Sequence, residues 1–307
     1  MLFALLFGLA GCYIDTAPIE KGEVVVIASD YLTPDDSILF EDYTNDHDIR
    51  VVIHTISCDS LISALDEALY DSGFDVVMMS SLTDVRRLYS KDMLHAIYET
   101  PAGFPGEYIS YDYDYFMVGY NPFVVIQTTD TLPVIQELDE LKTFEHRRSI
   151  TDNHSISLLS TFRTRMSRLE LYGWAKAWWK NSTYEKPTLK DSVPRYLTLL
   201  TDYYDLPDSI RSAFPIYHFP LGSDDRYRFE PISICIVHDA ENYKAALGFV
   251  EHWTNAGYNA LLNEKLHTIP VYEGGALEGS MFPISPEEQE NSIQYHLTTE
   301  RIIHRLK

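Results

Sequence analysis

The sequence predicts an α/β fold built on parallel sheets and divided into two similar halves. Short apolar runs rich in β-branched residues, the first at 24–28, are typical of strands covered on both faces. Segments with apolar residues at helical spacing separate these runs, and this alternation indicates parallel strands wound on both sides by helices. The 307 residues suffice for two medium domains, and no short internal repeat indicates a solenoid.

The first half of the chain shows the alternation most clearly. Thr33 is an expected helix N-cap, because a proline and two acids follow it, and that helix continues towards Tyr43. An apolar stripe with spacings of three and four residues predicts a second helix over 59–70, and a third passes through Leu88. The strands between these helices are expected at 24–28, 50–56 and 75–79.

The second half continues with less regular elements. The apolar periodicity predicts helices at 158–166, 169–180, 196–200 and 242–257 and near the C-terminus. The expected strands lie at 116–120, 149–150, 216–219 and 232–237. The polar residues 151–155 are expected to form a loop after the strand at 149–150.

The charge balance excludes one class of partner. The chain has 24 Lys and Arg against 46 Asp and Glu, a net charge of −22, and such a field repels phosphate backbones. We therefore expect no nucleic acid partner. The sequence also lacks the G-x-S-x-G, H-E-x-x-H, P-loop and G-x-G-x-x-G motifs, and its histidines show no zinc spacing. We expect no enzyme activity and no cofactor.

The N-terminus indicates export. Residues 1–12 (MLFALLFGLAGC) are apolar but shorter than the roughly 20 residues of a membrane span. The ending Leu-Ala-Gly-Cys resembles the bacterial lipobox, although no Lys or Arg precedes the apolar run. Residues 1–22 are then a signal and tether, and acyl chains such as palmitate on Cys12 hold the protein at the membrane, in the periplasm or on the cell surface. The alternative is a hydrophobic N-terminal strand. Cys58 and Cys235 are expected to be buried thiols.

Several ordered segments resemble type 2 extracellular solute-binding proteins of ABC importers. They cover roughly residues 23–275 in the order of that family. The resembling phrases are Val24-Val-Val-Ile-Ala-Ser-Asp-Tyr31, Phe74-Asp-Val-Val-Met-Met-Ser-Ser81, Lys91-Asp-Met-Leu-His95, Val118-Gly-Tyr-Asn121, Ile232-Ser-Ile-Cys-Ile-Val-His-Asp239 and Thr268-Ile-Pro-Val271.

This resemblance implies a monomer of two doubly wound α/β lobes joined by a hinge, with crossovers near 116–122 and 228–236. One lobe would comprise 23–117 and 236–307, and the other 118–235. A solute would bind between the lobes and be delivered to the permease of an ABC transporter. Loops at the carboxyl ends of the strands would contact it. The candidate residues are Ser29, Asp30, Tyr31, Ser80, Ser81, Tyr120, Asn121, His154 and Ser155.

The resemblance is strongest to the ferric-ion binders, which implies Fe³⁺ as the transported ligand. Its hard oxygen ligands would be Tyr31, Tyr203 and Tyr204. The family's tyrosine pair follows a strand, whereas this pair follows an expected helix, so packing tyrosines are an equal alternative. A second candidate is a small oxyanion or organic anion, because basic residues are concentrated within 142–168. An enzyme on the same scaffold and a surface lipoprotein without a transported solute also stay open.

Overall fold

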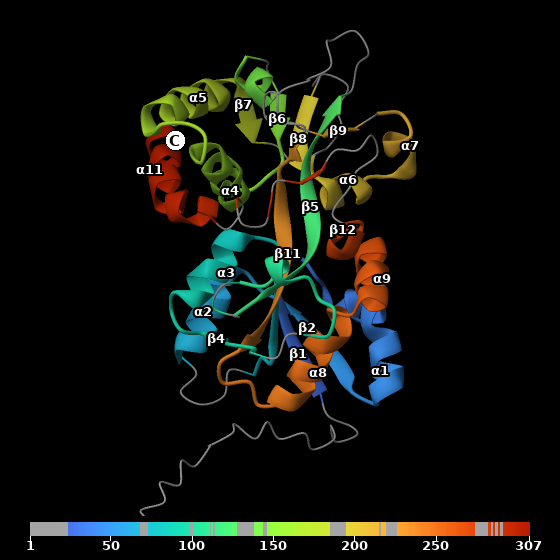
Figure 1. The fold of residues 1–307 in the computed structure, drawn as a ribbon. Helices are drawn as coiled ribbons and strands as arrows, with labels where there is room; N and C mark the ends of the chain where they lie inside the picture. Colours follow the sequence, from blue (N-terminus) through green and yellow to red (C-terminus); the bar gives the residue numbers. More distant parts are fainter. Residues whose placement is uncertain are drawn as a thin grey trace, which may run out of the picture.

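Figure 1 shows two α/β lobes joined by two long strands in the computed structural model of the chain. The structure describes residues 24–67, 73–98, 101–110, 112, 114–127, 138–143, 146–184, 195–214, 216–218, 226–273, 282–283, 285, 288 and 291–307. In that part of the chain, no helix combines the length and the apolar character that a membrane span requires.

In the first lobe the strand order is β2-β1-β3-β11-β5, with β11 at Phe229–Val237 and β5 at Phe116–Gln127, and the hydrogen-bonded sheet continues from β5 into the second lobe. The first three strands run parallel, as expected, and β11 is antiparallel to β3. The strands are β1 (Val24–Ser29), β2 (Arg50–Thr55), β3 (Val76–Met79) and the short β4 (Leu94–His95) and β12 (Ile269–Pro270). The helices are η1 (Pro34–Phe40), α1 (Glu41–His47), α2 (Cys58–Glu67), α3 (Leu82–Tyr89), η2 (Gly106–Tyr108), α8 (Tyr243–Trp253), α9 (Ala256–Leu266) and η4 (Val271–Glu273).

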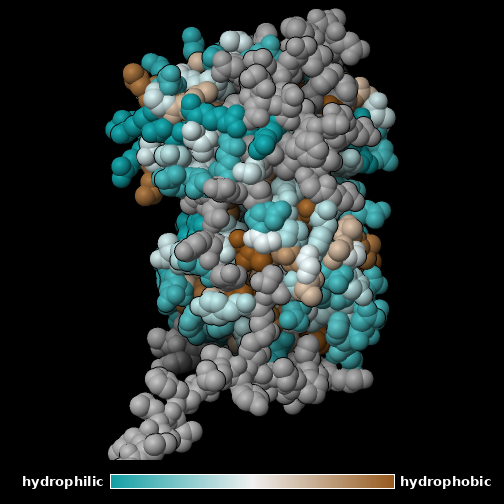
Figure 2. All heavy atoms as spheres, in the orientation of Figure 1, coloured by the Kyte–Doolittle hydropathy of each residue, from teal (hydrophilic) through white to brown (hydrophobic). Residues whose placement is uncertain are grey.

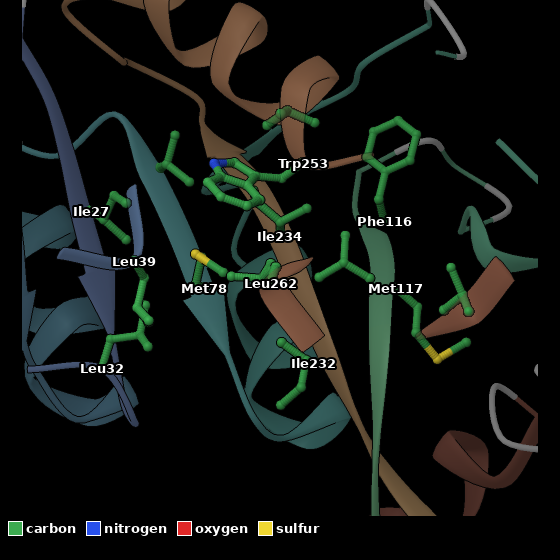
Figure 3. Close-up of a cluster of buried hydrophobic side chains, with 14 of the residues drawn as sticks. Ile27, Leu32, Leu39, Met78, Phe116, Met117, Ile232, Ile234, Trp253 and Leu262 are labelled. Atoms are coloured by element: carbon green, nitrogen blue, oxygen red, sulfur yellow. The ribbon is translucent and has the colours of Figure 1, made fainter. Parts of the chain in front are cut away.

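Two apolar clusters hold this lobe together, a large one that extends into the second lobe and a smaller one beneath α2 and α3. Side chains from the sheet, including Met78 and Ile234, and from the helices, including Trp253 and Leu262, belong to the large cluster (Figure 3). All four are buried. Burying one such side chain stabilises a fold by about 1.5–3 kcal/mol relative to leaving it exposed. Cys58 and Cys235 are buried free thiols, as expected.

Two antiparallel strands, β5 (Phe116–Gln127) and β11 (Phe229–Val237), cross from one lobe to the other. The crossovers expected near 116–122 and 228–236 lie at these strands. The first half of β5 pairs with β11 and β12, and its second half pairs with β8 and β9. Every residue of β5 and β11 is buried. Backbone hydrogen bonding is therefore continuous from one sheet to the other through β5, which limits how the lobes can move.

The second lobe packs helices against a smaller sheet. Its strands are β6 (His146–Arg148), β7 (Ser182–Tyr184), β8 (Arg195–Leu199) and β9 (Ile216–His218), and β10 (Arg226–Tyr227) pairs separately with β13 (Phe282–Pro283). Its helices are η3 (Leu138–Lys142), α4 (Asp152–Arg163), α5 (Arg168–Asn181), α6 (Leu200–Tyr204), α7 (Asp208–Arg211), η5 (Ile293–Tyr295) and α11 (His296–Leu306).

The C-terminal helix corrects the expected lobe boundary. The sequence assigned 236–307 to the first lobe, but α11 packs against α4 and α5 of the second. Ile302 and Ile303 are buried in the same cluster as Trp174 and Trp178. The apolar face of α11 thus completes the second core, and the chain returns to that lobe after α9.

Three local expectations also differ from the structure. The expected helix at 196–200 is largely β8, because its backbone pairs with β5 on one side and β6 on the other. The expected loop at 151–155 is mostly the first turn of α4, with Thr151 as a cap whose side chain accepts a hydrogen bond from the His154 amide. The expected helix at 242–257 is two helices, since Asn255 caps a new one.

Candidate functional site

A pocket of about 500 Å³ lies between the lobes, at the carboxyl ends of β1, β3 and β8. Ligands of open α/β sheets bind at this edge. The first lobe contributes Asp30, Tyr31, Leu32, Thr33, Asp36, Ser80, Lys265, Leu266, His267 and Thr268. The second lobe contributes His154, Leu199, Thr201, Asp202 and Asp205, and the crossover strands contribute Asn121 and Ile232. Walls from both lobes mean that any change in the angle between the lobes changes the pocket.

Asp30 ties the turn after β1 to the end of β3. Its carboxylate accepts hydrogen bonds from the Ser80 amide at 2.9 Å and the Ser80 hydroxyl at 3.0 Å. The Ser29 hydroxyl accepts from the amides of Tyr31 and Leu32, which closes the turn. Burial raises the pKa of Asp30 to about 6, the Ser80 amide opposes the shift, and the charge of Asp84 adds to it. Asp30 is thus mostly ionised at neutral pH.

Tyr31 and Asp36 continue this wall of the pocket. The Asp36 carboxylate accepts from the Thr33 amide and hydroxyl and caps η1. The Tyr31 hydroxyl is buried and has no hydrogen-bond partner among the described residues. Burial raises the pKa of Tyr31 well above its usual value, and the charges of Asp30 and Asp36 raise it further. The phenol is therefore neutral unless a cation approaches it.

The second lobe presents the start of α6 and of α4. Asn121 of β5 positions α6, because its amide donates to the Thr201 hydroxyl at 3.0 Å and its carbonyl accepts from the Thr201 amide. Asp202 accepts a hydrogen bond from Thr198, and Asp205 is exposed. His154 lies in the first turn of α4, where burial lowers its pKa to about 4. This histidine is neutral at neutral pH.

The pocket is electrically negative. Four lining carboxylates, those of Asp30, Asp36, Asp202 and Asp205, face one lining lysine, Lys265. The Lys265 ammonium lies 4.0 Å from Asp42 and 3.5 Å from the Leu39 carbonyl, so acceptors outside the pocket lining also hold it. A field of this sign attracts cations and repels anions.

The Lys and Arg residues of 142–168 do not form an anion site in this pocket, which was the second candidate from the sequence. The Arg148 guanidinium lies over the Trp179 ring at 3.7 Å and donates to the Ser155 hydroxyl. Arg163 lies over Tyr295, and Arg165 pairs with Glu288. No Lys or Arg of this segment lines the pocket.

Five of the nine expected contact residues line the pocket, namely Asp30, Tyr31, Ser80, Asn121 and His154. The other four are scaffold. The buried Ser29 and Ser155 hydroxyls bind backbone groups. Ser81 is buried at the start of α3, and the buried Tyr120 hydroxyl donates to the Tyr108 hydroxyl at 2.6 Å.

The expected ferric ligand set of Tyr31, Tyr203 and Tyr204 is not brought together. The Tyr203 hydroxyl donates to the carbonyls of Arg211 and Phe214, at 3.0 and 3.3 Å, and Tyr203 does not line the pocket. The Tyr204 ring stacks on His267 with centroids 4.6 Å apart. Thr201 and Asp202, in the first turn of α6 after β8, line the pocket instead.

No three described His, Cys, Asp or Glu side chains form a preformed metal cluster. Sequence reasoning missed Asp36, Thr201, Asp202, Asp205 and His267. An interpretation of 196–200 as a strand would have placed Thr201 and Asp202 at its carboxyl end, where ligand contacts are expected. Cys12 lies outside the described residues.

Polar contacts of α3 also join the two lobes. The Asn153 amide donates to both carboxylate oxygens of Asp84 at 3.3 Å, which links α4 to α3. The Thr83 hydroxyl lies 2.9 Å from Nδ1 of His296, which links α3 to α11. The first lobe thus contacts both α4 and α11 of the second lobe through α3.

Comparisons with known proteins identify the fold. No protein-family model and no curated protein sequence matches the chain. Among solved structures, the Trichodesmium protein IdiA (FutA) in complex with iron and citrate has a TM-score of 0.76 at 15% identity, covering 92% of this chain and 99% of its own. Ferric iron-binding protein A of Mannheimia haemolytica, in an open conformation, has a TM-score of 0.75 at 14% identity, with coverages of 92% and 98%. Iron-bound HitA of Pseudomonas aeruginosa has a TM-score of 0.75 at 13% identity, with coverages of 91% and 98%. The chain therefore has the two-lobed fold of type 2 solute-binding proteins.

Proposed function

We propose that this protein is a solute-binding protein that captures a small cation between its lobes, outside the cytoplasm, and delivers it to the permease of an ABC importer. The observation that carries the proposal is the negatively charged pocket lined from both lobes and both crossover strands. A ligand that contacts both walls favours the closed arrangement of the lobes, which is how two-lobed binding proteins trap their ligands. The proposed role is capture and not chemistry.

Ferric iron is the first cation to test. The iron in the structures of IdiA (FutA) and HitA supports it, and so do the carboxylates of the pocket, because a hard trivalent cation prefers oxygen ligands. Tyr203 and Tyr204 are not part of this proposal, so carboxylates and Tyr31 would be the ligands. A pocket of about 500 Å³ is also large enough for an organic ammonium ion.

The lipid anchor on Cys12 and the periplasmic or surface location belong to the same proposal. Their support is the N-terminal sequence MLFALLFGLAGC. Anchoring through acyl chains would keep the binding protein close to its importer.

Isothermal titration of purified protein with separate solutes tests the proposal. The probes are Fe³⁺ supplied as a nitrilotriacetate complex, spermidine, inorganic phosphate and citrate. We expect one of the two cations to bind with a Kd in the micromolar range or tighter, and phosphate and citrate not to bind. An iron–phenolate absorption band that disappears in Tyr31→Phe would identify iron held by Tyr31. Binding of an anion alone would contradict the cation assignment, and binding of none of the four would contradict solute capture.

We expect cation affinity to fall as the solution is acidified. A cation is attracted to ionised Asp30, whose pKa of about 6 means that the carboxylate gains a proton as the pH falls below that value. Between about pH 7.5 and pH 5 the affinity should fall about tenfold more in the wild type than in Asp30→Asn. The same raised pKa has the opposite effect on folding, because stability increases as the pH falls through about 6 and the buried charge is neutralised. An equal pH dependence in both proteins would contradict a role for Asp30.

A further inference from the structure

A second groove lies on the flank of the second lobe, between α5 and α11. It has a volume of about 340 Å³ and is lined by Arg168, Leu169, Tyr172, Arg301, Ile302 and Arg305. It shares no residue with the interlobe pocket. The groove exists because the C-terminal helix returns to this lobe and packs on α5.

The groove is basic in a strongly acidic protein. Arg168, Arg301 and Arg305 are exposed, and none forms an ion pair with an acid of the described residues. Neighbouring cations do have acidic partners, since Arg165 pairs with Glu288 and Lys307 with Asp152. Three arginines without an acidic partner among the described residues, in a chain of net charge −22, form a local reversal of sign.

The acids closest in sequence to these arginines are already engaged. The Glu170 carboxylate accepts a hydrogen bond from the Ser167 amide in the capping box of α5. The Glu300 carboxylate lies 3.8 Å from the His304 ring, one turn further along α11. Neither of these two acids forms an ion pair with Arg168, Arg301 or Arg305.

Apolar side chains stand out beside these arginines. Leu169 is 81% exposed and Leu297 is 68% exposed, and they are among the most exposed large hydrophobic residues that the structure describes. Leu297 lies one helical turn before Arg301, on the same face of α11. Figure 2 shows isolated hydrophobic atoms within a hydrophilic surface on the flank that carries α5 and α11. Arginine and tyrosine are enriched at protein-binding surfaces, and exposed leucines beside them add apolar area that a partner can bury.

We propose that this groove, the α5–α11 groove, is a docking site for a protein segment that carries Asp or Glu side chains around an apolar residue. Charge complementarity favours an acidic partner, because carboxylates would pair with Arg168, Arg301 and Arg305. The leucines favour a macromolecule over a small anion, because a ligand confined to the groove would not cover Leu297 one turn away. An anionic membrane is disfavoured by the net charge of the chain. The proposal does not depend on which solute the interlobe pocket binds.

Site-specific photo-crosslinking in cells tests this proposal. A photoreactive phenylalanine analogue replaces Leu169 in the full chain, and mass spectrometry identifies the captured peptide. The same analogue in place of Tyr98, which is 79% exposed on the first lobe, is the matched control. We expect the Leu169 position to capture a segment of another protein that contains acidic and apolar residues, and the Tyr98 position not to capture it.

Reversing the charge of two groove arginines then tests whether the crosslinked segment binds the groove or is only close to it. Arg301→Glu with Arg305→Glu should lower the yield of crosslinked product about tenfold, and acid-to-lysine changes in the captured segment should restore it. Both arginines are exposed, so unchanged thermal unfolding and solute binding should show that the double variant is folded. The proposal is overturned by no crosslink, by crosslinks only to lipid or to a second copy of this chain, by a segment without acids, or by a yield that charge reversal leaves unchanged.

Discussion

The double substitution Asp202→Asn with Asp205→Asn is expected to weaken cation binding about a hundredfold, since each tenfold loss corresponds to about 1.4 kcal/mol of binding free energy. Both carboxylates line the interlobe pocket, Asp202 from α6 and Asp205 from the C-cap of that helix. They are better targets than Asp30 and Asp36, which accept hydrogen bonds from backbone amides that hold β3 and η1 in place. The loss should therefore appear in affinity, and thermal unfolding of the free protein should change little.

A matched control removes the same charge from elsewhere. Glu67 and Glu241 are exposed residues of the first lobe that do not line the pocket. The double variant Glu67→Gln with Glu241→Gln should bind the cation like the wild type at physiological salt, where charges separated by more than about 8 Å are largely screened. Equal losses in the two double variants would mean that the overall charge of the protein, and not the pocket, attracts the solute.

Gly119→Ala is expected to destabilise the protein by about 3 kcal/mol or more, because it forces a buried, fully bonded amide to move. Gly119 lies in β5, and a Cβ atom there would overlap Oδ1 of Asn263 in α9. The Asn263 side chain cannot turn away freely. Its amide donates to the Val118 carbonyl and the Asn259 carbonyl at 2.8 Å, and its oxygen accepts from the Thr268 hydroxyl at 2.6 Å.

Urea unfolding of four variants checks this prediction. The controls are Gly173→Ala, Asn263→Ala and the double variant Gly119→Ala with Asn263→Ala. Gly173 has no atom within 4 Å of an added Cβ and lies in α5, so Gly173→Ala should be neutral or stabilising by up to about 1 kcal/mol. The double variant should be no less stable than Asn263→Ala alone, since the overlap is then removed. Strictly additive losses, or a neutral Gly119→Ala, would show that α9 adjusts without cost.

Most strands and helices of the first lobe were predictable because the local pattern of apolar residues indicates which residues are buried. β1 and β3 are continuous β-branched or apolar runs, and α2 carries an apolar stripe at helical spacing. The segment 196–200 carries no such unambiguous pattern. Its leucines suit either a helix or a covered strand, and only pairing with β5 and β6 makes it β8. The docking of α11 on the second lobe is likewise a long-range contact that no local pattern contains.

In the candidate site, too, some residues were predictable from local sequence and others depend on tertiary contacts. Asp30, Tyr31 and Ser80 were predictable, because a strand followed by small polar residues places those residues at the carboxyl edge of a parallel sheet. Tyr203 and Tyr204 were expected as a pair of hard ligands. In the structure the Tyr203 hydroxyl donates to the carbonyls of Arg211 and Phe214 instead. Residue type alone does not determine which way a side chain points.

Composition and order along the chain thus determine an acidic α/β protein with strands that end in polar loops, since charge and periodicity are properties of neighbouring residues. Tertiary contacts decide which acids share one pocket. Asp30 and Asp202 are far apart in the chain and meet only because β5 and β11 hold two sheets end to end. The same contacts bring Arg168 beside Arg301 and Arg305. The interlobe pocket is negative and the α5–α11 groove is positive because tertiary contacts bring charged side chains from distant segments together in each.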